Sequence, residues 1–406
     1  MTETPTYDCL IAGAGPIGLT MANALHRRGI SYCLCGSLPH EGRNSPDLRT
    51  AALFSGSIRL LERLGVWQGL SEIATSLTGI RIVDDTERLL RAPEQLFAAA
   101  DLGQERLGYN IANPALVRAL VHTLDVPGTS SARHDIGATI TDYRAAPDAI
   151  TATLADGTER RARLVIAADG RNSPARTAAG ISVQSWSYDQ TAITAHLTHS
   201  LPHHDISTEI HTLEGPCTVV PFGDHRSSLV WMMKPETANR LTAGNETDFT
   251  AALENQLHGV IGTVTTLTPR RTFPLSSLIA NRFGANRTAL IGEAGHAFPP
   301  IGAQGLNLGL RDVATLLDHI CAALDQGNDP GSDAVLNAYS AARQADVTAR
   351  TYGVDAMNAS LSGRLTGLFR GALLHATTLS PAVRRSVLSR GMAPLGEWPT
   401  LMRTNA

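Results

Sequence analysis

The chain opens with a pattern of apolar and polar positions that predicts a β-strand, a tight turn and an α-helix. Residues 7–12 are a short apolar run, residues 13–18 contain three glycines, and residues 16–28 carry apolar side chains at helical spacing. A second short apolar run follows at 31–35. This order predicts a βαβ unit at the start of an α/β domain.

The pattern then alternates between helical and strand-like segments. Apolar residues at helical spacing predict a helix over 57–66, and another helix is expected to begin with Asn113 as its N-cap and Pro114 in its first position. Between 138 and 168 the period changes to two. Asp156-Gly157 predicts a hairpin turn between strands at 150–154 and 158–163, within an antiparallel meander.

The second half of the chain divides into a strand-rich part and a helical part. Residues 182–271 alternate with period two, apart from helical spacing at 249–257, and predict a separate antiparallel sheet. After Gly292 the spacing is mostly helical, with breaks predicted at 327–331 and at Pro381.

Composition narrows the classes of protein to consider. The chain has 406 residues, 43% of them hydrophobic, and a formal net charge of −3, which fits two closely joined globular domains and offers no basic excess for binding nucleic acid. No window approaches the roughly 18 uninterrupted apolar residues of a membrane span, and the first residues, MTETPT, do not resemble a signal peptide. We therefore expect a cytoplasmic protein.

The five cysteines suggest neither a disulfide framework nor a zinc site. Cys9, Cys33, Cys35, Cys217 and Cys321 are scattered, odd in number and without a CxxC pair, so no metal site is predicted. Cys33 and Cys35 alternate along a predicted strand, which favours buried core thiols over a redox pair.

The glycine-rich turn is the first candidate site. Gly13, Gly15, Pro16, Ile17 and Gly18 belong to a GxGxxG motif that follows a strand and opens a helix, the context expected of a dinucleotide-binding loop. The glycines allow close approach of the backbone, and the helix start offers unpaired N–H groups to a pyrophosphate. A purely structural glycine-rich turn is the alternative.

One part of the dinucleotide fingerprint is absent. An acid that holds the ribose hydroxyls is expected about 20 residues downstream, and that position falls on Gly36. Losing a charge-assisted hydrogen bond costs about 1.5–3 kcal/mol. We expect weaker binding of the adenosine unless Ser37 or a water molecule replaces this contact.

Two later segments resemble motifs of the flavoprotein hydroxylases. Residues 165–176 (VIAADGRNSPAR), with Asp169 and Gly170, resemble the DG motif, and residues 289–300 (ALIGEAGHAFPP), with Gly292 and Glu293, resemble the GD motif. Together with the N-terminal glycines they identify FAD as the implied dinucleotide. In the family the GD acid contacts the ribityl chain and is usually aspartate, so Glu293 is a departure.

The resemblance continues into the next predicted helix. Residues 302–312 (GAQGLNLGLRD) resemble the family's GQGxNLGxxD stretch, except that Ala303 replaces its first glycine. The family turns backbone N–H groups there toward the pyrimidine edge of the flavin. The resemblance implies that Gly302, Gly305, Leu306 and Asn307 bind the cofactor, whereas a glycine-rich cap on a buried helix is the structural alternative.

Two polar residues near these motifs have open roles. Arg49, in the segment 47–53 (DLRTAAL), matches an arginine that the hydroxylases place near the flavin, and its alternative is a solvated, salt-bridged arginine. His296 follows the GD acid and is interpreted as a structural histidine at least as readily as a proton-transfer group. No catalytic residue is predicted.

Within the family, the chain is most similar to the hydroxylases of ubiquinone biosynthesis. The resemblance extends through 188–192, 215–216, 228–231 and 273–275 to a tail with Tyr339, Arg343, Asp346 and 354–358. It implies an α/β fold with an FAD-binding Rossmann-like (ββα) three-layer domain, an inserted antiparallel β-sheet substrate domain and a C-terminal helical segment. The implied bounds are 1–75, 105–180 and 275–345 for the FAD-binding domain, 76–104 and 181–274 for the substrate domain, and 346–406 for the C-terminal helices.

The same resemblance implies an activity. Reduced FAD would react with O2 to form a flavin hydroperoxide, whose distal oxygen is transferred to an aromatic ring, such as a polyprenyl phenol or quinol intermediate of ubiquinone biosynthesis. With no second GxGxxG, NAD(P)H or a partner reductase would donate electrons transiently. A flavin oxidoreductase without oxygen insertion stays open, as does a non-catalytic relative in an assembly, which the departures at Gly36 and Glu293 favour.

The C-terminal stretch 361–402 combines apolar residues with arginines. This composition suits either a face that rests on the inner surface of an anionic membrane, alone or within a biosynthetic complex, or a face that packs on the body of the protein. The residues concerned are Arg364, Leu365, Leu368, Phe369, Arg370, Leu373 and Leu374.

Overall fold

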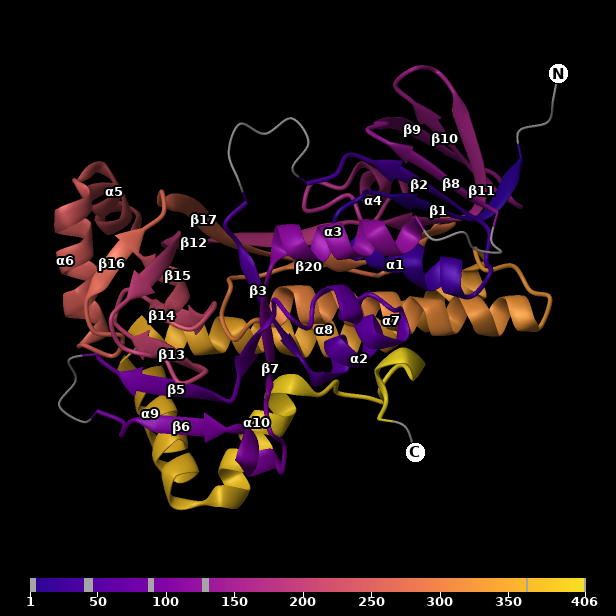
Figure 1. Cartoon of the computed structure of the whole chain (residues 1–406). Coiled ribbons are helices and arrows are strands. Elements are labelled where there is room, and N and C mark those ends of the chain that lie inside the picture. Colours follow the sequence, from indigo (N-terminus) through magenta and orange to yellow (C-terminus); the bar gives the residue numbers. More distant parts are fainter. Residues whose placement is uncertain (1–4, 40–46, 87–90, 126–130, 363, 405–406) are drawn as a thin grey trace.

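The N-terminal segment forms the centre of a parallel sheet. The structure, a computed structural model, describes residues 5–39, 47–86, 91–125, 131–362 and 364–404, without the side chains of 362–369 (Figure 1). Parallel pairing gives the order β19-β11-β1-β2-β8, and the short β18 pairs antiparallel with β19 at the edge. The predicted βαβ unit is confirmed. Its elements and partners are β1 (Thr6–Ala12), α1 (Pro16–Arg27), β2 (Tyr32–Gly36), β8 (Ala132–Ile136), β11 (Glu159–Ala167), β18 (Gly284–Ala285) and β19 (Thr288–Leu290).

The predicted meander covers one face of this sheet. β9 (Ile140–Ala145) and β10 (Ile150–Leu154) pair antiparallel with each other, and β10 pairs with β11 across the turn that contains Gly157. Helices α1, α3 (Asn113–Leu124) and α7 (Gln304–Asp325) lie on the opposite face (Figure 1). The result is a three-layer ββα arrangement around the largest hydrophobic core.

The predicted N-cap of α3 is wrong by one residue. Ala112, not Asn113, is the N-cap, and no side chain caps this helix. The reason is the pairing of β7 (Gly108–Ala112) with β3 (Thr50–Phe54), which keeps the backbone extended as far as Ala112. Asn113 is therefore already helical, and its Oδ1 is buried without a partner in the described structure. β4 (Thr75–Leu77) completes this small sheet, and α2 (Ser55–Arg63) follows β3.

A second, nine-stranded sheet forms the other half of the molecule. Its order is β20-β17-β12-β15-β14-β13-β5-β6, with β16 beside β12. All pairs are antiparallel except β5 with β13, because β5 enters from an earlier part of the chain. The strands are β5 (Gly79–Asp84), β6 (Gln95–Ala98), β12 (Val183–His199), β13 (Ile206–His211), β14 (Pro216–Pro221), β15 (Arg226–Met233), β16 (Val264–Leu267), β17 (Arg271–Ala280) and β20 (His296–Ala297).

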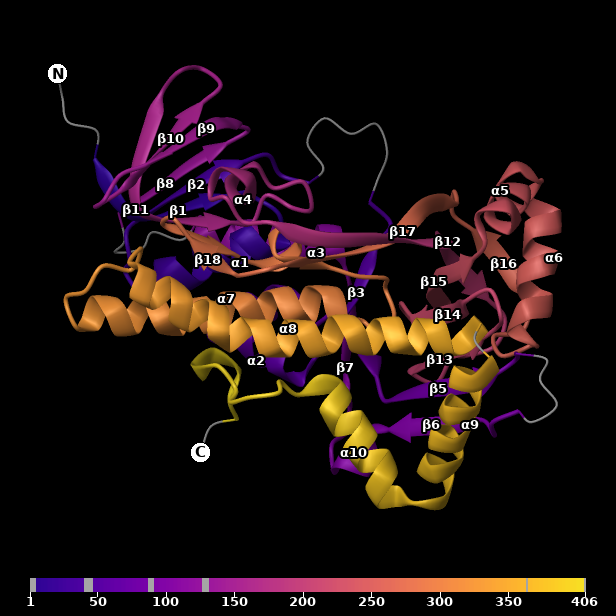
Figure 2. The ribbon, with the colours of Figure 1, turned by 180° about the vertical axis from the view of Figure 1, so that it is seen from behind.

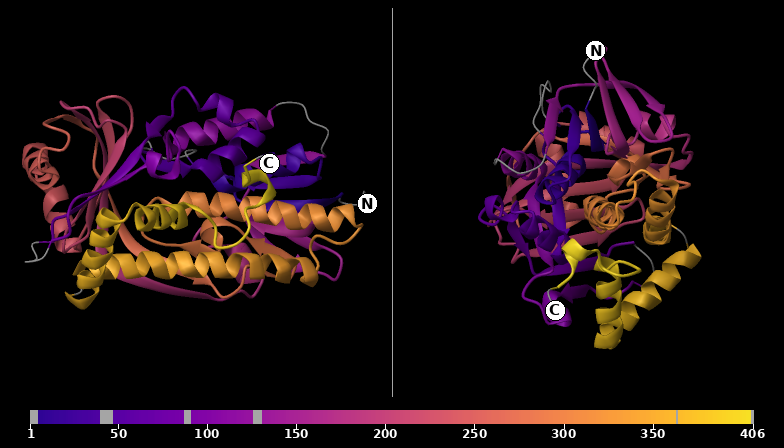
Figure 3. Two further views of the ribbon diagram at one scale, coloured as in Figure 1. Left: turned by 90° about the horizontal axis from the view of Figure 1, so that it is seen from below. Right: turned by 90° about the vertical axis from the view of Figure 1, so that its right-hand side faces the viewer.

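Helices cover both faces of the second sheet. α5 (Pro235–Ala243), which the pattern did not predict, and α6 (Glu246–Leu257), which it did, pack on one face around Ile210, Trp231 and Phe249. On the other side, α7 and α8 (Asp333–Ser362) lie side by side along the molecule, and α9 (Arg364–Leu379) and α10 (Pro381–Met392) turn beside β5 and β6 (Figures 2 and 3).

The breaks predicted at 327–331 and at Pro381 separate these C-terminal helices as expected. The short α4 (Pro174–Ala178) follows the DG segment. α8 is continuous across position 346, where the resemblance implied a domain boundary. Among the described residues, no helix is both long and apolar enough to cross a bilayer.

Candidate cofactor and substrate site

One large cavity lies between the two sheets. Its volume is about 1050 Å³, at the upper end of the range for small-molecule sites, so it can hold more than one ring system. The glycine-rich turn and the end of β2 line one end, and the face of the second sheet lines the other. Most of the residues that the motifs singled out meet here.

The starts of α1 and α7 line this cavity over several residues each, and their first turns are uncapped. Gly15 is the N-cap of α1 and Ala303 that of α7, and neither helix has a side-chain cap or an acid in its first turn. Both starts line the cavity. Unpaired N–H groups and the positive end of the helix dipole therefore face it from two directions, which suits a pyrophosphate at one start and an electron-rich ring edge at the other.

The three glycines of the N-terminal turn have different surroundings. A Cβ on Gly13 would lie 2.3 Å from the carbonyl oxygen of Ala168, and one on Gly18 would lie 1.9 Å from that of Gly13. Gly13 thus allows the turn to pack on the residue that follows β11, and Gly18 allows the start of α1 to pack on the turn. A Cβ on Gly15 would meet nothing within 4 Å, because Gly15 borders the cavity. A side chain there would fill space that a pyrophosphate needs, so this loop fits a dinucleotide.

The backbone explains why position 36 has no acid. Gly36 has a φ of +148°, which favours glycine, and a Cβ there would lie 2.7 Å from the backbone nitrogen of Ala14. An acidic side chain would thus collide with the glycine-rich turn. Ser37 comes next and also lines the cavity. Replacement of the acid by Ser37 stays a prediction.

The DG segment brings a half-buried carboxylate to the cavity. Asp169 Oδ2 accepts a hydrogen bond from the Ala175 N–H at 3.1 Å, while its Oδ1 is buried and has no partner among the described residues. Burial raises the pKa of Asp169. Asp169 and Gly170 both line the cavity. An unpaired buried acceptor at this point fits a ligand that carries hydroxyl groups, as the ribityl and ribose parts of FAD do.

Arg49 and Glu293 line the middle of the cavity. Arg49 forms two hydrogen bonds of 2.9 Å with the carboxylate of Asp47, and this pairing, together with the charge of Glu293, raises its pKa. Arg49 is thus both salt-bridged and in the cavity wall, which combines the two alternatives given by the sequence. Glu293 and Gly292 belong to a short 3₁₀ helix, Gly292–Ala294, and both reach the cavity.

The start of α7 separates the expected residues into two groups. Gly302, Gly305 and Leu306 line the cavity, but Asn307 does not. The Asn307 side chain accepts hydrogen bonds from the Phe54 N–H and the Ser57 hydroxyl, and donates to the carbonyls of Ala52 and Ala303. Its amide therefore joins α7 to β3 instead of lining the cavity.

Ala303 occupies a position at which glycine is favoured. Its φ of +54° lies in the left-handed region, which costs a residue with a Cβ about 1–2 kcal/mol. The family's glycine at this point has a physical reason, and this chain retains the same turn in spite of the alanine.

His296 lies outside the cavity wall, in a buried ion network. Its Nε2 is 2.7 Å from Asp312 Oδ2, the same oxygen that accepts a hydrogen bond from the Gly292 N–H. Arg343 donates to the other oxygen of Asp312 at 2.7 Å. Burial raises the pKa of Asp312, but the charges of His296 and Arg343 outweigh burial and lower this pKa overall. The network ties the GD segment to α7 and α8, which agrees with the structural interpretation of His296.

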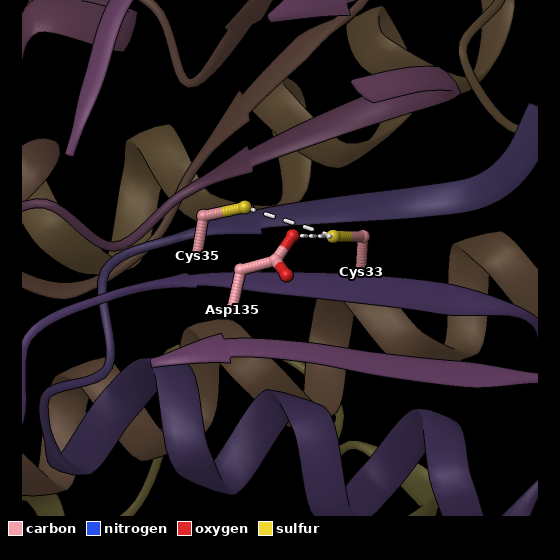
Figure 4. Close-up of side chains that lie close together, drawn as sticks. All are labelled: Cys33, Cys35 and Asp135. Carbon is pink, nitrogen blue, oxygen red and sulfur yellow. Dashed lines mark hydrogen bonds between the residues drawn. The ribbon is translucent and has the colours of Figure 1, made fainter. Parts of the chain in front are cut away.

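Cys33 and Cys35 lie together on one face of β2 (Figure 4). Their sulfur atoms are 3.6 Å apart, and Cys33 Sγ is 3.5 Å from Asp135 Oδ2. Within the described part of the chain this is the one cluster with donor atoms spaced for a metal ion. The guanidinium groups of Arg133 and Arg160, however, already bind the carboxylate of Asp135. Both thiols are buried, so the predicted core cysteines are confirmed.

Sequence reasoning predicted a substrate domain at 181–274 but named none of its residues as part of the site. A row of side chains crosses neighbouring strands there: Glu209 on β13 lies opposite Thr218, Thr218 opposite Val230, and Val230 opposite Thr194. All four line the cavity. The segment 206–211 (ISTEIH) does alternate, but a polar face normally indicates solvent, and only the fold shows that this face is covered. The apolar part of the wall includes Leu77, Ile80, Val220, Phe273, Leu275 and Phe298.

Comparisons with known proteins match this architecture. The family described as FAD binding domain matches residues 6–352. A ubiquinone hydroxylase, UbiL, of Rhodospirillum rubrum is 35% identical over 342 residues, 84% of this chain and 78% of that protein. The 3-demethoxyubiquinol 3-hydroxylase of Escherichia coli is 32% identical over 403 residues, 96% of this chain and 98% of that protein. The crystal structure of p-nitrophenol 4-monooxygenase PnpA of Pseudomonas putida has a TM-score of 0.77 at 18% identity, covers 96% and 99% of the two chains, and shares the fold.

Proposed function

This chain belongs to the FAD binding domain family, and from that membership we propose that it is an FAD-dependent monooxygenase that hydroxylates an aromatic ring. The proposed substrate is a polyprenyl phenol or quinol of ubiquinone biosynthesis, with O2 as the source of oxygen, as the names of its relatives suggest. The observation that carries the proposal is the continuous cavity that runs from two uncapped helix starts to a largely apolar chamber on a β-sheet.

The chain's own residues would hold FAD along this cavity. The start of α1, with Gly15, Pro16 and Ile17, would bind the pyrophosphate, and Asp169 would accept hydrogen bonds from hydroxyl groups. Gly305 and Leu306, at the start of α7, would donate to the pyrimidine edge of the ring. When bound and reduced, FAD supplies the activation of O2 that transfers one oxygen atom to the substrate.

The remaining task of the protein is to orient the substrate and to exclude water. Phe273, Leu275 and Phe298 form apolar wall near the start of α7, and the row from Glu209 to Thr194 forms the floor of the chamber. An apolar enclosure keeps water from diverting the reduced cofactor's reaction with O2. This floor belongs to the nine-stranded sheet, whereas most of the glycine-rich segments proposed to hold FAD belong to the domain of the parallel sheet.

The electron donor in this proposal is NAD(P)H or a partner reductase that binds transiently. The sequence has no second GxGxxG motif for a permanently bound nicotinamide. The choice of donor is tested by mixing the FAD-loaded protein with NADH or NADPH and measuring the loss of nicotinamide absorbance. If neither NADH nor NADPH reduces the bound FAD, a partner reductase is the donor.

Association with an anionic membrane surface is a further part of the proposal. Leu373, Leu379 and Leu395 are 50%, 83% and 61% exposed, and Arg385 and Arg390 are exposed on α10. Arg370 and Leu374, by contrast, pack on the body of the protein, while the side chains of Arg364, Leu365, Leu368 and Phe369 lie outside the described residues. Co-sedimentation with phosphatidylglycerol vesicles tests the association, which Leu379→Ser should weaken.

Titration of the purified protein with FAD, followed by its visible absorption, is the first test of the proposed function. We expect one FAD per chain. No binding at high FAD would contradict the proposal and favour a non-catalytic assembly component. The departure at Gly36 does not itself favour that alternative, because the local backbone leaves no room for an acid.

A further inference from the structure

Glu209 is a buried carboxylate in the substrate chamber. The residue is 8% exposed and lines the cavity from the middle of β13. Two other carboxylates in the cavity wall, Asp169 and Glu293, belong to the DG and GD segments. Among the described residues, Glu209 is therefore the acid that the second sheet contributes to the chamber.

The neighbours of Glu209 determine which atoms carry protons. Arg370 on α9 lies 3.0 Å from Nδ1 of His211, and a guanidinium can only donate hydrogen bonds. Nδ1 must then be the acceptor, so the ring proton of a neutral His211 is on Nε2. That nitrogen is 2.7 Å from Glu209 Oε1 and donates to it. Oε1 of Glu209 is consequently the acceptor in this pair.

Arg370 is itself fixed by a second buried acid. Its guanidinium is 2.8 Å from Asp84 Oδ1, and both side chains are less than 10% exposed. Asp84 Oδ2 accepts a further hydrogen bond from the Ala92 N–H at 3.0 Å. The series Asp84, Arg370, His211 and Glu209 thus holds the carboxylate of Glu209 in one orientation beneath α9.

One oxygen of Glu209 is left for a ligand. Within the described part of the chain, His211 is the partner of Oε1, and no hydrogen bond reaches Oε2. On the cavity side, its neighbours in the sheet are Thr218, which lies opposite on β14, Ser207, two residues earlier on β13, and Ile80, which lies opposite Ser207 on β5. In this position the ionised form of Glu209 is stabilised by a ligand that donates a hydrogen bond and is repelled by one that presents only lone pairs.

We propose that Glu209 recognises a free hydroxyl group on the substrate ring, and that the chamber therefore selects phenols and quinols over ring ethers and quinones. The proposal rests on the proposed function and adds the residue by which the same cavity would distinguish its ligands. Ether and quinone oxygens have no proton to donate, so they would place a lone pair against the carboxylate. His211 and Arg370 are positioning residues, because they act through Glu209.

The test compares ligands that differ in the hydroxyl group. The FAD-loaded protein is titrated with a 4-alkylphenol and with its methyl ether, and the change in flavin absorbance reports binding. Wild-type protein should bind the phenol about 10- to 100-fold more tightly, as expected for a hydrogen bond to a charged group. In Glu209→Gln the amide oxygen would accept from His211 and the NH2 group would face the cavity, so the preference should vanish or reverse.

Control variants separate this role from a general effect on the fold. Glu246→Gln changes an exposed glutamate at the start of α6 and should keep the wild-type ratio. His211→Asn should reduce the ratio while the bound FAD stays unchanged, because only the orientation of Glu209 is affected.

Each outcome decides between the two proposals. A phenol-to-ether ratio near one in the wild-type protein, or an unchanged ratio in Glu209→Gln, would overturn the inference even if the protein binds FAD and hydroxylates a ring. Failure of the wild-type protein to bind FAD would overturn the proposed function and, with it, this inference. If Glu209→Gln does not fold, an unchanged phenol-to-ether ratio in His211→Asn overturns the inference instead.

Discussion

Gly13 and Gly15 lie in one loop but meet different physical requirements. Gly13 packs against the carbonyl of Ala168, whereas Gly15 has an ordinary extended backbone, with φ −75° and ψ 177°, and open space beside its Cα. Gly13 is needed for packing of the turn, whereas Gly15 is needed to leave the cavity open. The motif alone does not separate these roles, since both are written as G.

The difference predicts opposite effects of substitution. Gly15→Val should fold with little change in melting temperature but bind FAD at least about 100-fold more weakly, because its side chain enters the space of the pyrophosphate. Gly13→Ala should instead lower the melting temperature, since its Cβ would be 2.3 Å from a backbone oxygen. Thermal unfolding and FAD titration of both variants check this, and a folded Gly15→Val with wild-type FAD affinity would contradict it.

Residue chemistry accounts for one of the local departures from the family pattern, because Gly36 avoids a collision with Ala14. It does not account for Ala303, whose left-handed backbone at the start of α7 favours glycine. The sequence marked both positions as exceptions. The sequence could not explain them, because a local pattern of residues does not give a backbone dihedral angle or a contact between distant segments.

At the scale of elements, the series that joins α9 to the second sheet has a predictable pH dependence. Burial raises the pKa of Asp84, but the Ala92 N–H, Arg370 and Thr86 outweigh it and bring the pKa to about 2, against an ordinary 3.8. The folded state thus favours the ionised form. Its stabilising contribution is present above the ordinary pKa and is lost as the pH falls through about 2.

The expected magnitude follows from the shift. Asp84, which is 7% exposed, should contribute about 2 kcal/mol at about pH 6, and about half of that at about pH 3. Urea unfolding of wild-type protein and Asp84→Asn at the two pH values measures the difference. Asp142→Asn, an exposed residue of β9, is the matched control and should keep the wild-type stability. A difference that grows toward acid pH would be inconsistent with the ion pair.

Elements with strong local signals were predictable, and those defined by their neighbours were not. The βαβ unit, the hairpin at Asp156-Gly157 and the break at Pro381 follow from turn residues and periodicity within a few positions. The start of α3 was misplaced by one residue because it depends on the pairing of β7 with β3. Helix α5 was not predicted because its segment was interpreted as strands. The polar face of β13 was ambiguous because alternation does not say what covers a face.

At the scale of the whole molecule, the cavity has a cofactor end, whose residues the motifs name, and a proposed substrate end on the second sheet, which the sequence predicted as a domain without naming its site residues. The cofactor end is made largely of glycine-rich loops in which backbone groups do the work, so short motifs reveal it. The substrate end combines β12, β13, β14 and β15, and its residues meet only when the sheet forms. Thr194, Glu209 and Thr218 therefore left no signal in sequence, although they line the same cavity as Gly15 and Leu306.

Incorporation of labelled oxygen tests the central claim, that this cavity carries out ring hydroxylation, most directly. The FAD-loaded protein would be incubated with a phenol or quinol, NADH or NADPH, and ¹⁸O₂, with ¹⁶O₂ in a parallel reaction, and the product analysed by mass spectrometry. Ring hydroxylation by this cavity should place one atom of ¹⁸O in the ring product of each turnover. Consumption of the substrate without ¹⁸O in the product, or with oxygen taken from water, would contradict it and assign the protein to flavin oxidoreductases that do not insert oxygen.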